Sequence, residues 1–331
     1  MQKTGWIYLS LAVALLTIIA VPMYLYNQPL GPSLDLDQSQ AAVVASSGEG
    51  KMQLSSPLEL SSDETCSASG RVNILFLGQN LSETHQRGAD AIRLMFINYD
   101  TPSIASLSLP PELLVNTTKL EDVERTTLTL AFWLGKQTPP QGQPAALKQA
   151  TEVVAQALLD DFGFTAEKYV TINQRVFGQM IETLGGITVY VGAPVAASGE
   201  MGPFIAGEQE MDSQTVLDYV RITGPGDPLG VEQARFTRQD EVVDGVYNAL
   251  LNPGNIIKLP SLIGEFYNLL ITDLQPKELR SLYCMLSEEK VIFWNETITS
   301  DMILSISRGG EMNPDAAAIS ALVDDLASWT P

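Results

Sequence analysis

The chain has few histidines, cysteines and basic residues, and each shortage narrows the chemistry it can perform. Its 331 residues include one histidine, His85, and two cysteines. Histidine-rich zinc sites and Ser-His-Asp catalysis need imidazoles that the chain lacks. Basic residues number 19 against 39 acidic ones, for a formal net charge of -20, and such a field repels phosphodiester backbones. We therefore expect no nucleic-acid partner, and chemistry carried by arginine, carboxylate, hydroxyl and amide groups.

Charge is also absent from a long stretch near the N-terminus. No residue from Trp6 to Tyr26 is charged, and about 20 apolar residues suffice to span a hydrocarbon core. Lys3 precedes this stretch and acidic residues follow it, so the positive-inside rule places the N-terminus in the cytoplasm and the body outside the cell membrane. A cleaved secretory signal is the alternative, but its apolar region is usually only about 7–15 residues long. We predict a cytoplasmic stub and an uncleaved single-pass transmembrane anchor over residues 1–27.

The composition suggests three further divisions of the chain. Residues 28–65 are rich in serine and acidic residues, which predicts a flexible linker. The main domain is expected over residues 66–290, and residues 291–331 are expected to add a C-terminal strand and helix. An extracytoplasmic location permits a disulfide between Cys66 and Cys284; two buried free thiols are the equal alternative.

Short apolar runs alternate with amphipathic segments through the main domain. RVNILFLGQN, AIRLMFINYD, SIASLSL, EKYVTINQ and ITVYV are expected strands because they are short, apolar and bounded by Gly, Pro or polar loops. Helical spacing of apolar residues predicts helices near residues 143–164, 175–186, 214–221 and 238–251. This alternation predicts an α/β fold, an α-β-α sandwich with a central mixed sheet.

The order of these segments resembles the LytR-CpsA-Psr family, also called the cell-envelope-related transcriptional attenuator domain. The resemblance covers roughly residues 71–251, and TDLQPKEL at residues 272–279 is similar to the family's closing helix. It implies a membrane-anchored extracytoplasmic phosphotransferase. Such an enzyme moves a glycopolymer from a polyprenyl-pyrophosphate carrier to peptidoglycan or a similar cell-wall acceptor glycan, and Mg²⁺ assists cleavage of the pyrophosphate.

One arginine motif of the family is almost complete. In D-x-x-R-x-x-R-Q, Glu232 stands for the aspartate, while Arg235, Arg238 and Gln239 are present. Phosphoryl transfer depends on positioning and charge neutralisation, so the resemblance makes the two arginines catalytic pyrophosphate ligands and Gln239 an orienting group. A helix beginning near Glu232 places all three on one face, where its N-terminal dipole favours an anion. An exposed helix with surface ion pairs is the alternative.

Two other motifs have lost an arginine. In Y-V-R-x-R, Arg221 is present as a third pyrophosphate ligand, but the second arginine is Thr223. In S-I-P-R-D, Pro111 replaces the arginine and Glu112 stands for the aspartate. Glu112 either takes the role of that aspartate or is a solvated loop carboxylate.

The metal motifs are also incomplete. In G-S-D the aspartate is replaced by Asn80, whereas R-S-D-T keeps Asp90 and has its arginine one residue early, as Arg87. The resemblance therefore implies Mg²⁺ held by Asp90 and more weakly by Asn80, since Mg²⁺ retains waters and borrows substrate oxygens. Strand alternation is expected to point Arg93 away from Asp90, and His85 is expected to be a solvated loop residue.

These losses leave two functions open. Each missing electrostatic group typically costs about 10²–10³ in rate. The first function is a transferase that works with fewer charged groups. The second is a non-catalytic envelope protein that binds polyprenyl phosphates or scaffolds cell-wall assembly.

Overall fold

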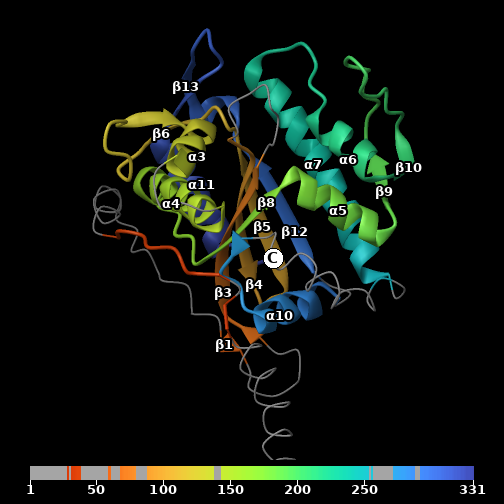
Figure 1. The fold of residues 1–331 in the computed structure, drawn as a ribbon, viewed down its shortest axis with the longest axis horizontal. Helices are drawn as coiled ribbons and strands as arrows, with labels where there is room; N and C mark the ends of the chain where they lie inside the picture. The colour runs from red at the N-terminus through yellow and green to blue at the C-terminus, as the bar shows by residue number, and fades with distance from the viewer. Residues whose placement is uncertain are drawn as a thin grey trace, which may run out of the picture.

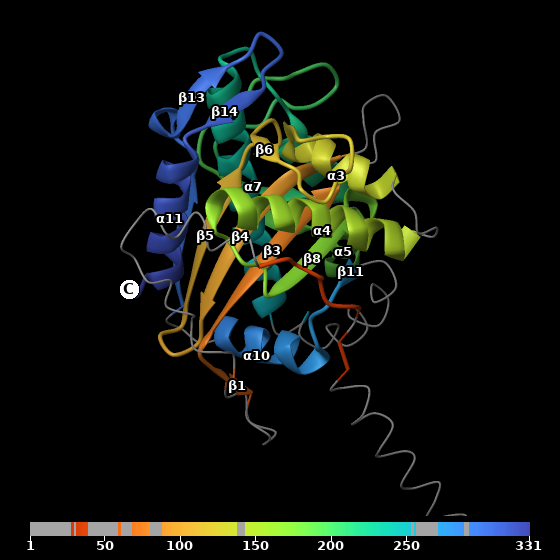
Figure 2. The same cartoon turned by 90° about the vertical axis from the view of Figure 1, so that its left-hand side faces the viewer.

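A six-stranded mixed sheet forms the centre of the molecule. The computed structural model describes residues 28–29, 31–38, 59–60, 68–79, 88–137, 143–252, 255, 271–287 and 291–331. The strand order is β11-β8-β3-β4-β5-β12 (Figures 1 and 2). The strands are β3 (Arg71–Gln79), β4 (Ala89–Asn98), β5 (Ser103–Leu109), β8 (Lys168–Asn173), β11 (Ile271–Thr272) and β12 (Ile292–Thr297). β4 is antiparallel to both β3 and β5, β8 is parallel to β3, β12 is parallel to β5, and β11 is antiparallel to β8. The predicted mixed-sheet α/β fold is confirmed.

Helices cover both faces of the sheet (Figures 1 and 2). One face carries α3 (Leu128–Gln137), α4 (Gln143–Phe162) and α11 (Ala316–Ser328). The other carries α5 (Gln174–Leu184), α6 (Ser213–Arg221), α7 (Pro228–Leu251) and the hairpin of β9 (Ile187–Val191) and β10 (Gly207–Met211). Every residue of β5 is buried, as expected for a strand covered on both faces. α10 (Pro276–Leu286) packs on a separate apolar cluster at one end of the sheet.

Residues 31–38 form an N-terminal strap along α4. The Asp35 amide donates to Glu152 Oε1 and the Asp37 amide donates to Gln156 Oε1, each at 2.8 Å. Two residues of an extended chain advance ~6.6 Å and four residues of a helix advance ~6 Å, so the two repeats match. The partly buried Leu34 packs against the core, as does Leu36. The flexible linker predicted across residues 28–65 is therefore wrong for the strap.

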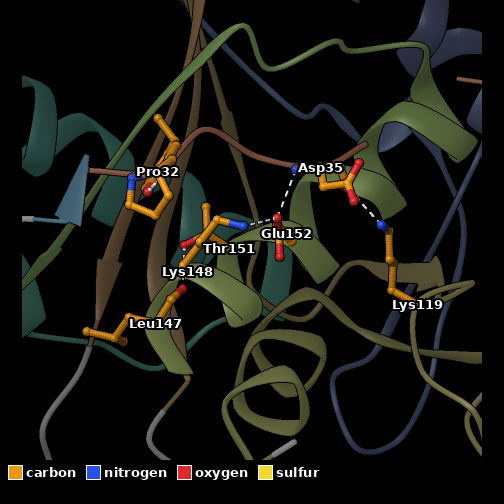
Figure 3. Close-up of polar contacts among 8 residues, drawn as sticks. Pro32, Asp35, Lys119, Leu147, Lys148, Thr151 and Glu152 are labelled. Carbon is orange, nitrogen blue, oxygen red and sulfur yellow. Dashed lines mark hydrogen bonds and ion pairs between the residues drawn. The ribbon is translucent and has the colours of Figure 1, made fainter. Parts of the chain in front are cut away.

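Side chains beside α4 also hold the strap (Figure 3). Lys119 Nζ donates to the carbonyl of Asp35 at 2.7 Å. Tyr169 donates its hydroxyl to the carbonyl of Pro32 at 2.9 Å. Lys148 pairs with Glu152, the residue that accepts the Asp35 amide (Figure 3). The strap is therefore fixed from both sides by polar contacts as well as by apolar packing.

The predicted transmembrane anchor over residues 1–27 lies outside the described residues. Among the residues that are described, no helix combines the length and apolar character needed to cross a bilayer. Cys284 is buried in α10 and is disulfide-bonded, whereas its predicted partner Cys66 lies outside the described residues.

The C-terminal segment is part of the same sheet and core. The sequence predicted a strand and helix extension over residues 291–331. The strand, β12, pairs with β5 at the edge of the central sheet, and α11 packs beside α4. Between them, β13 (Ile303–Ile306) and β14 (Met312–Pro314) form a hairpin. β14 reaches the loop after β5, where β6 (Leu114–Asn116) pairs with β7 (Arg125–Thr127).

Candidate functional site

The site residues meet at one end of the central sheet. β3 and β5 finish at the end where β4 begins, because Gln79 pairs with Ala89 and Leu109 pairs with Ile92. The loop after β5 leads directly to Glu112. The N-terminal half of α7 lies against the same end, because Gln233 Nε2 donates at 2.9 Å to the carbonyl of Ile298, which directly follows β12, the strand parallel to β5. The topology thus brings residues from three distant segments together.

Asp90 occupies a β-bulge at the start of β4. Gly78 of β3 pairs with Ala91, and Gln79 pairs with Ala89, so Asp90 is the extra residue between them. A bulge re-aims a side chain and interrupts the alternation of a strand. Asp90 is half-buried there.

Glu112 is held by the C-terminal hairpin. The Met312 amide of β14 donates to the Glu112 carbonyl at 2.9 Å. Burial raises the pKa of the Glu112 carboxyl, and the nearby carboxylates of Glu232 and Asp90 raise it further, whereas Arg235 lowers it. Its Oε2 is buried and has no hydrogen-bond partner within the described part of the chain. Glu112 therefore has a partly buried carboxyl close to Asp90, Glu232 and Arg235, and is not a solvated loop residue.

Arg235 lies beside these carboxyl groups. It is 9% exposed, and its guanidinium forms an ion pair with Glu232 one turn earlier in α7. Burial raises the pKa of Glu232, and Arg235 opposes that effect. Arg235 Nε is buried and lacks a hydrogen-bond partner among the described residues. A buried, unpaired N–H of a cation is costly unless a ligand accepts it.

Arg238 has a different environment. It is 8% exposed; its Nε donates to the carbonyl of Tyr219 at 3.0 Å, and its Nη2 donates to the carbonyl of Ile222. Both acceptors lie at the C-terminal end of α6, where carbonyl groups have no partner within the helix. Burial lowers the pKa of the guanidinium below its ordinary value, yet arginine remains charged in proteins. Arg238 therefore joins α6 to α7 through two of its five N–H groups.

The helix that carries both arginines starts earlier than predicted. α7 begins at Pro228, with Asp227 as its N-cap accepting from the Gly230 amide at 2.9 Å. Arg235 is consequently beyond the first turn, where the dipole effect has largely decayed. The prediction that the helix N-terminus supports an anion beside these arginines is therefore wrong. Gln239 is half-buried.

The remaining predicted arginines are not all brought to this cluster. Arg221 is exposed at the end of α6, between the two residues whose carbonyls accept from Arg238. Arg93 pairs with Asp240, two turns further along α7 than Glu232. The alternation argument for Arg93 does not hold across the bulge, but this pairing commits its guanidinium to the middle of α7.

The predicted magnesium ligands fall only partly within the described residues. No group of three or more histidine, cysteine, aspartate or glutamate residues among them is arranged to hold a metal ion. Asp90 is the described member of the predicted ligand pair. The other predicted ligand, Asn80, lies outside the described residues, as do Arg87 and His85.

The sequence did not reveal two residues that organise the site. Tyr219 donates its hydroxyl to Glu241, and its carbonyl accepts from Arg238. The three-residue spacing of Arg238 and Glu241 places them on one helix face, but nothing in the sequence shows that both contact the same tyrosine.

The arrangement is suited to an anion. Arg235 and Arg238 are two buried guanidinium groups. Arg235 pairs with Glu232, and the nearby carboxylates of Glu241 and Glu232 favour the charged form of Arg238. Buried arginines bind phosphate oxygens with paired N–H groups, more strongly than exposed ones do.

Comparisons with known proteins agree with this geometry. The model of the LytR_cpsA_psr family matches residues 36–306. A curated relative, the polyisoprenyl-teichoic acid–peptidoglycan teichoic acid transferase TagU of Oceanobacillus iheyensis, is 24% identical over 211 residues, which cover 64% of this chain and 61% of that relative. TagU of Bacillus subtilis is 25% identical over 202 residues, covering 61% of this chain and 60% of its own length. The matches thus span less than two thirds of these relatives.

Solved structures share the fold. The crystal structure of Bacillus subtilis TagV aligns with a TM-score of 0.59 and 19% identity, covering 79% of this chain and 98% of TagV. Protein gbs0355 of Streptococcus agalactiae aligns with a TM-score of 0.61 and 15% identity, covering 78% of this chain and 89% of gbs0355.

Proposed function

Because the chain belongs to the LytR_cpsA_psr family, we propose that it transfers a glycopolymer from a polyprenyl-pyrophosphate carrier to peptidoglycan or a similar cell-wall acceptor glycan. The observation that carries the proposal is Arg235, a buried guanidinium whose Nε has no partner in the described residues. A phosphate oxygen supplies such a partner. Teichoic acid transferases are named among the relatives, which supports this class of substrate.

The proposed reaction is a displacement at phosphorus. A hydroxyl of the acceptor attacks the phosphorus that bears the glycan, the bridging P–O bond breaks, and polyprenyl phosphate leaves. The hydroxyl proton passes to solvent or to the leaving phosphate. Arg235 and Arg238 neutralise the pyrophosphate charge, which is the main contribution a protein makes to phosphoryl transfer. Glu232 orients Arg235 through their ion pair.

The remaining features of the proposal concern Mg²⁺ and the membrane. Mg²⁺ binds oxygen ligands and usually retains several waters, and Asp90 is the described carboxylate proposed to contribute to it. Bound there, the ion would neutralise pyrophosphate charge.

The charge-free stretch from Trp6 to Tyr26 is proposed to anchor the protein in the cell membrane, with the N-terminus cytoplasmic and the folded body extracytoplasmic.

A second function is favoured by one specific observation. Pro111 is buried where the related motif has an arginine, and proline offers no hydrogen-bond donor. A site with this loss retains the capacity to bind a polyprenyl phosphate while catalysing poorly. The second candidate is therefore a non-catalytic binding or scaffolding protein of cell-wall assembly.

Calorimetric titration of the full chain with inorganic pyrophosphate tests the proposed site. Arg235→Ala should weaken binding by about tenfold to a hundredfold, as expected for loss of a hydrogen bond to a charged group. Arg71→Ala is the matched control: it removes an arginine that donates to carbonyls at the end of α11, including Trp329 at 3.1 Å, at the opposite end of the sheet. Equal affinities for wild type and Arg235→Ala would refute the assignment.

A further inference from the structure

Tyr219 is held at two points by α7. Its ring is 1% exposed and packs edge-on against Phe204, with ring centroids 4.8 Å apart. Its hydroxyl donates to Glu241 Oε2, and its carbonyl accepts from Arg238 Nε at 3.0 Å. Arg238 and Glu241 are three residues apart on one face of α7. One helix thus holds both ends of the same residue.

Glu241 also links a third element to this arrangement. Its Oε1 accepts from the Gly192 amide, immediately after β9, at 2.8 Å. A Cβ atom at position 192 would lie 2.9 Å from that oxygen, so glycine permits the close approach. Burial and the hydrogen bond to Glu241 both raise the pKa of Tyr219, which keeps the phenol protonated and able to donate. Both carboxylate oxygens are therefore committed to structural contacts.

The end of α6 has few other constraints. Residues 223–227, in the connection between α6 and α7, are all exposed. The carbonyls that receive Arg238 are therefore fixed mainly through Tyr219 and the buried Ile222. A long arginine side chain loses considerable rotamer entropy when it is ordered, and partners that are already rigid reduce that cost at the moment of binding.

We propose that Tyr219 and Glu241 are positioning residues that fix the Arg238 guanidinium for a phosphate-bearing substrate. The inference rests on the proposed function, in which Arg238 binds pyrophosphate, and adds the contacts that orient it. Glu241 acts on Tyr219, Tyr219 presents its carbonyl to Arg238 Nε, and the remaining N–H groups of Arg238 face the ligand.

The test compares two tyrosine-to-phenylalanine changes. Tyr219→Phe removes the hydroxyl that contacts Glu241 and leaves the ring. Tyr247→Phe is the matched control, on α7 with Arg238 and Glu241: it removes a hydroxyl that donates to the Leu286 carbonyl at 2.9 Å and keeps the ring packed on Phe293. Glu241→Gln retains groups able to contact both Tyr219 and Gly192. Its Arg238 Nε–H exchange rate and its Kd for pyrophosphate should stay close to the wild-type values.

Two measurements on the full chain read out the effect. Hydrogen exchange of the Arg238 Nε–H, identified in NMR spectra by its loss in Arg238→Lys, should become at least about tenfold faster in Tyr219→Phe, because one hydrogen bond is typically worth a factor of this order. Titration with inorganic pyrophosphate should show Kd raised about fivefold to tenfold by the same change. In an Arg238→Ala background Tyr219→Phe should no longer alter Kd, since its effect passes through Arg238.

Unchanged exchange in Tyr219→Phe would overturn the proposal, and so would faster exchange with an unaltered Kd. Equal effects from Tyr247→Phe would also overturn it, because they would reveal general loosening of α7. Failure of the wild-type protein to bind pyrophosphate would count against the proposed function alone. The exchange measurement would then still decide whether Tyr219 fixes Arg238.

Discussion

Glu112 and Arg235 are neighbouring residues of the candidate site, and each has a buried hydrogen-bonding atom without a partner among the described residues. Glu112 Oε2 lacks a donor and Arg235 Nε lacks an acceptor among the described residues. Burial raises the pKa of the Glu112 carboxyl and so favours its protonated form. A phosphate bound at the proposed pyrophosphate site would accept from Arg235 Nε and from a protonated Glu112.

The first prediction concerns the pH dependence of stability. Burial raises the folded-state pKa of Glu112 above its ordinary value of 4.5. Above that value, and up to the raised pKa, the folded state holds a proton that the unfolded state has lost, so stability falls as pH rises through this window. Glu112→Gln removes that contribution. Urea unfolding at about pH 4 and pH 7 should therefore show a smaller loss of unfolding free energy for the variant than for wild type.

Glu121→Gln, which changes an exposed glutamate, is the control and should retain the wild-type difference between the two pH values. Glu232 shares the window, because burial also raises its pKa. Glu112→Gln should therefore reduce the slope without abolishing it. An identical slope in wild type and Glu112→Gln would contradict the burial of this carboxyl.

At the level of residues, the sequence specified which side chains are at the site better than it specified their contacts. Motif matching placed Arg235, Arg238, Glu112 and Asp90 near one another, and the structure brings their segments together. The carbonyl acceptors of Arg238 were not predictable, since a side chain that bonds backbone groups leaves no pattern in the sequence. The bulge at Asp90 was equally hidden, because strand register depends on the partner strand.

The N-terminal strap shows at the scale of elements how a short segment can contribute stability. Its contacts with α4 combine backbone hydrogen bonds and two partly buried leucines. Serine and acidic composition predicted a linker, but composition averages over the whole segment. The alternation of Leu34 and Leu36 with Asp35 and Asp37 is the local signal of a half-buried extended chain.

The second prediction tests the strap. Replacing Leu34 and Leu36 together by alanine should lower Tm by on the order of 5 °C, since partial burial of two leucines contributes a few kcal/mol in a domain of this size. Thermal unfolding of the full chain gives the value. Leu304→Ala, which truncates a leucine that is 64% exposed on β13, should leave Tm within about 1 °C. Equal Tm values for the double variant and wild type would show that the strap does not contribute to folding.

The segment beyond residue 290 completes the molecule. β12 extends the central sheet beside β5, α11 covers one face, and β14 fixes Glu112 through the Met312 amide. The sequence predicted a strand and a helix here. It did not predict that the strand joins the central sheet, because pairing between segments far apart in the chain has no local signature.

The third prediction is that a chain ending at residue 290 will not fold. Loss of residues 291–331 would expose the wholly buried β5 and the core residues against which Ile319, Val323 and Leu326 pack. A large exposed apolar surface favours aggregation. Soluble yield and circular dichroism measure the outcome. A chain lacking only the exposed Thr330 and Pro331 is the control. A soluble, cooperatively unfolding protein ending at residue 290 would show that residues 291–331 are not needed to complete the central sheet and its core.

Glycan transfer by the full chain tests the proposed function. The full chain in detergent is supplied with a polyprenyl-pyrophosphate oligosaccharide, a peptidoglycan acceptor and Mg²⁺, and mass spectrometry quantifies the glycan joined to the acceptor and the polyprenyl phosphate released. Wild type and Arg71→Ala should form the two products in equal amounts, and Arg235→Ala should lower the rate about a hundredfold or more. Tight binding of the carrier with neither product formed would contradict it and identify a binding protein.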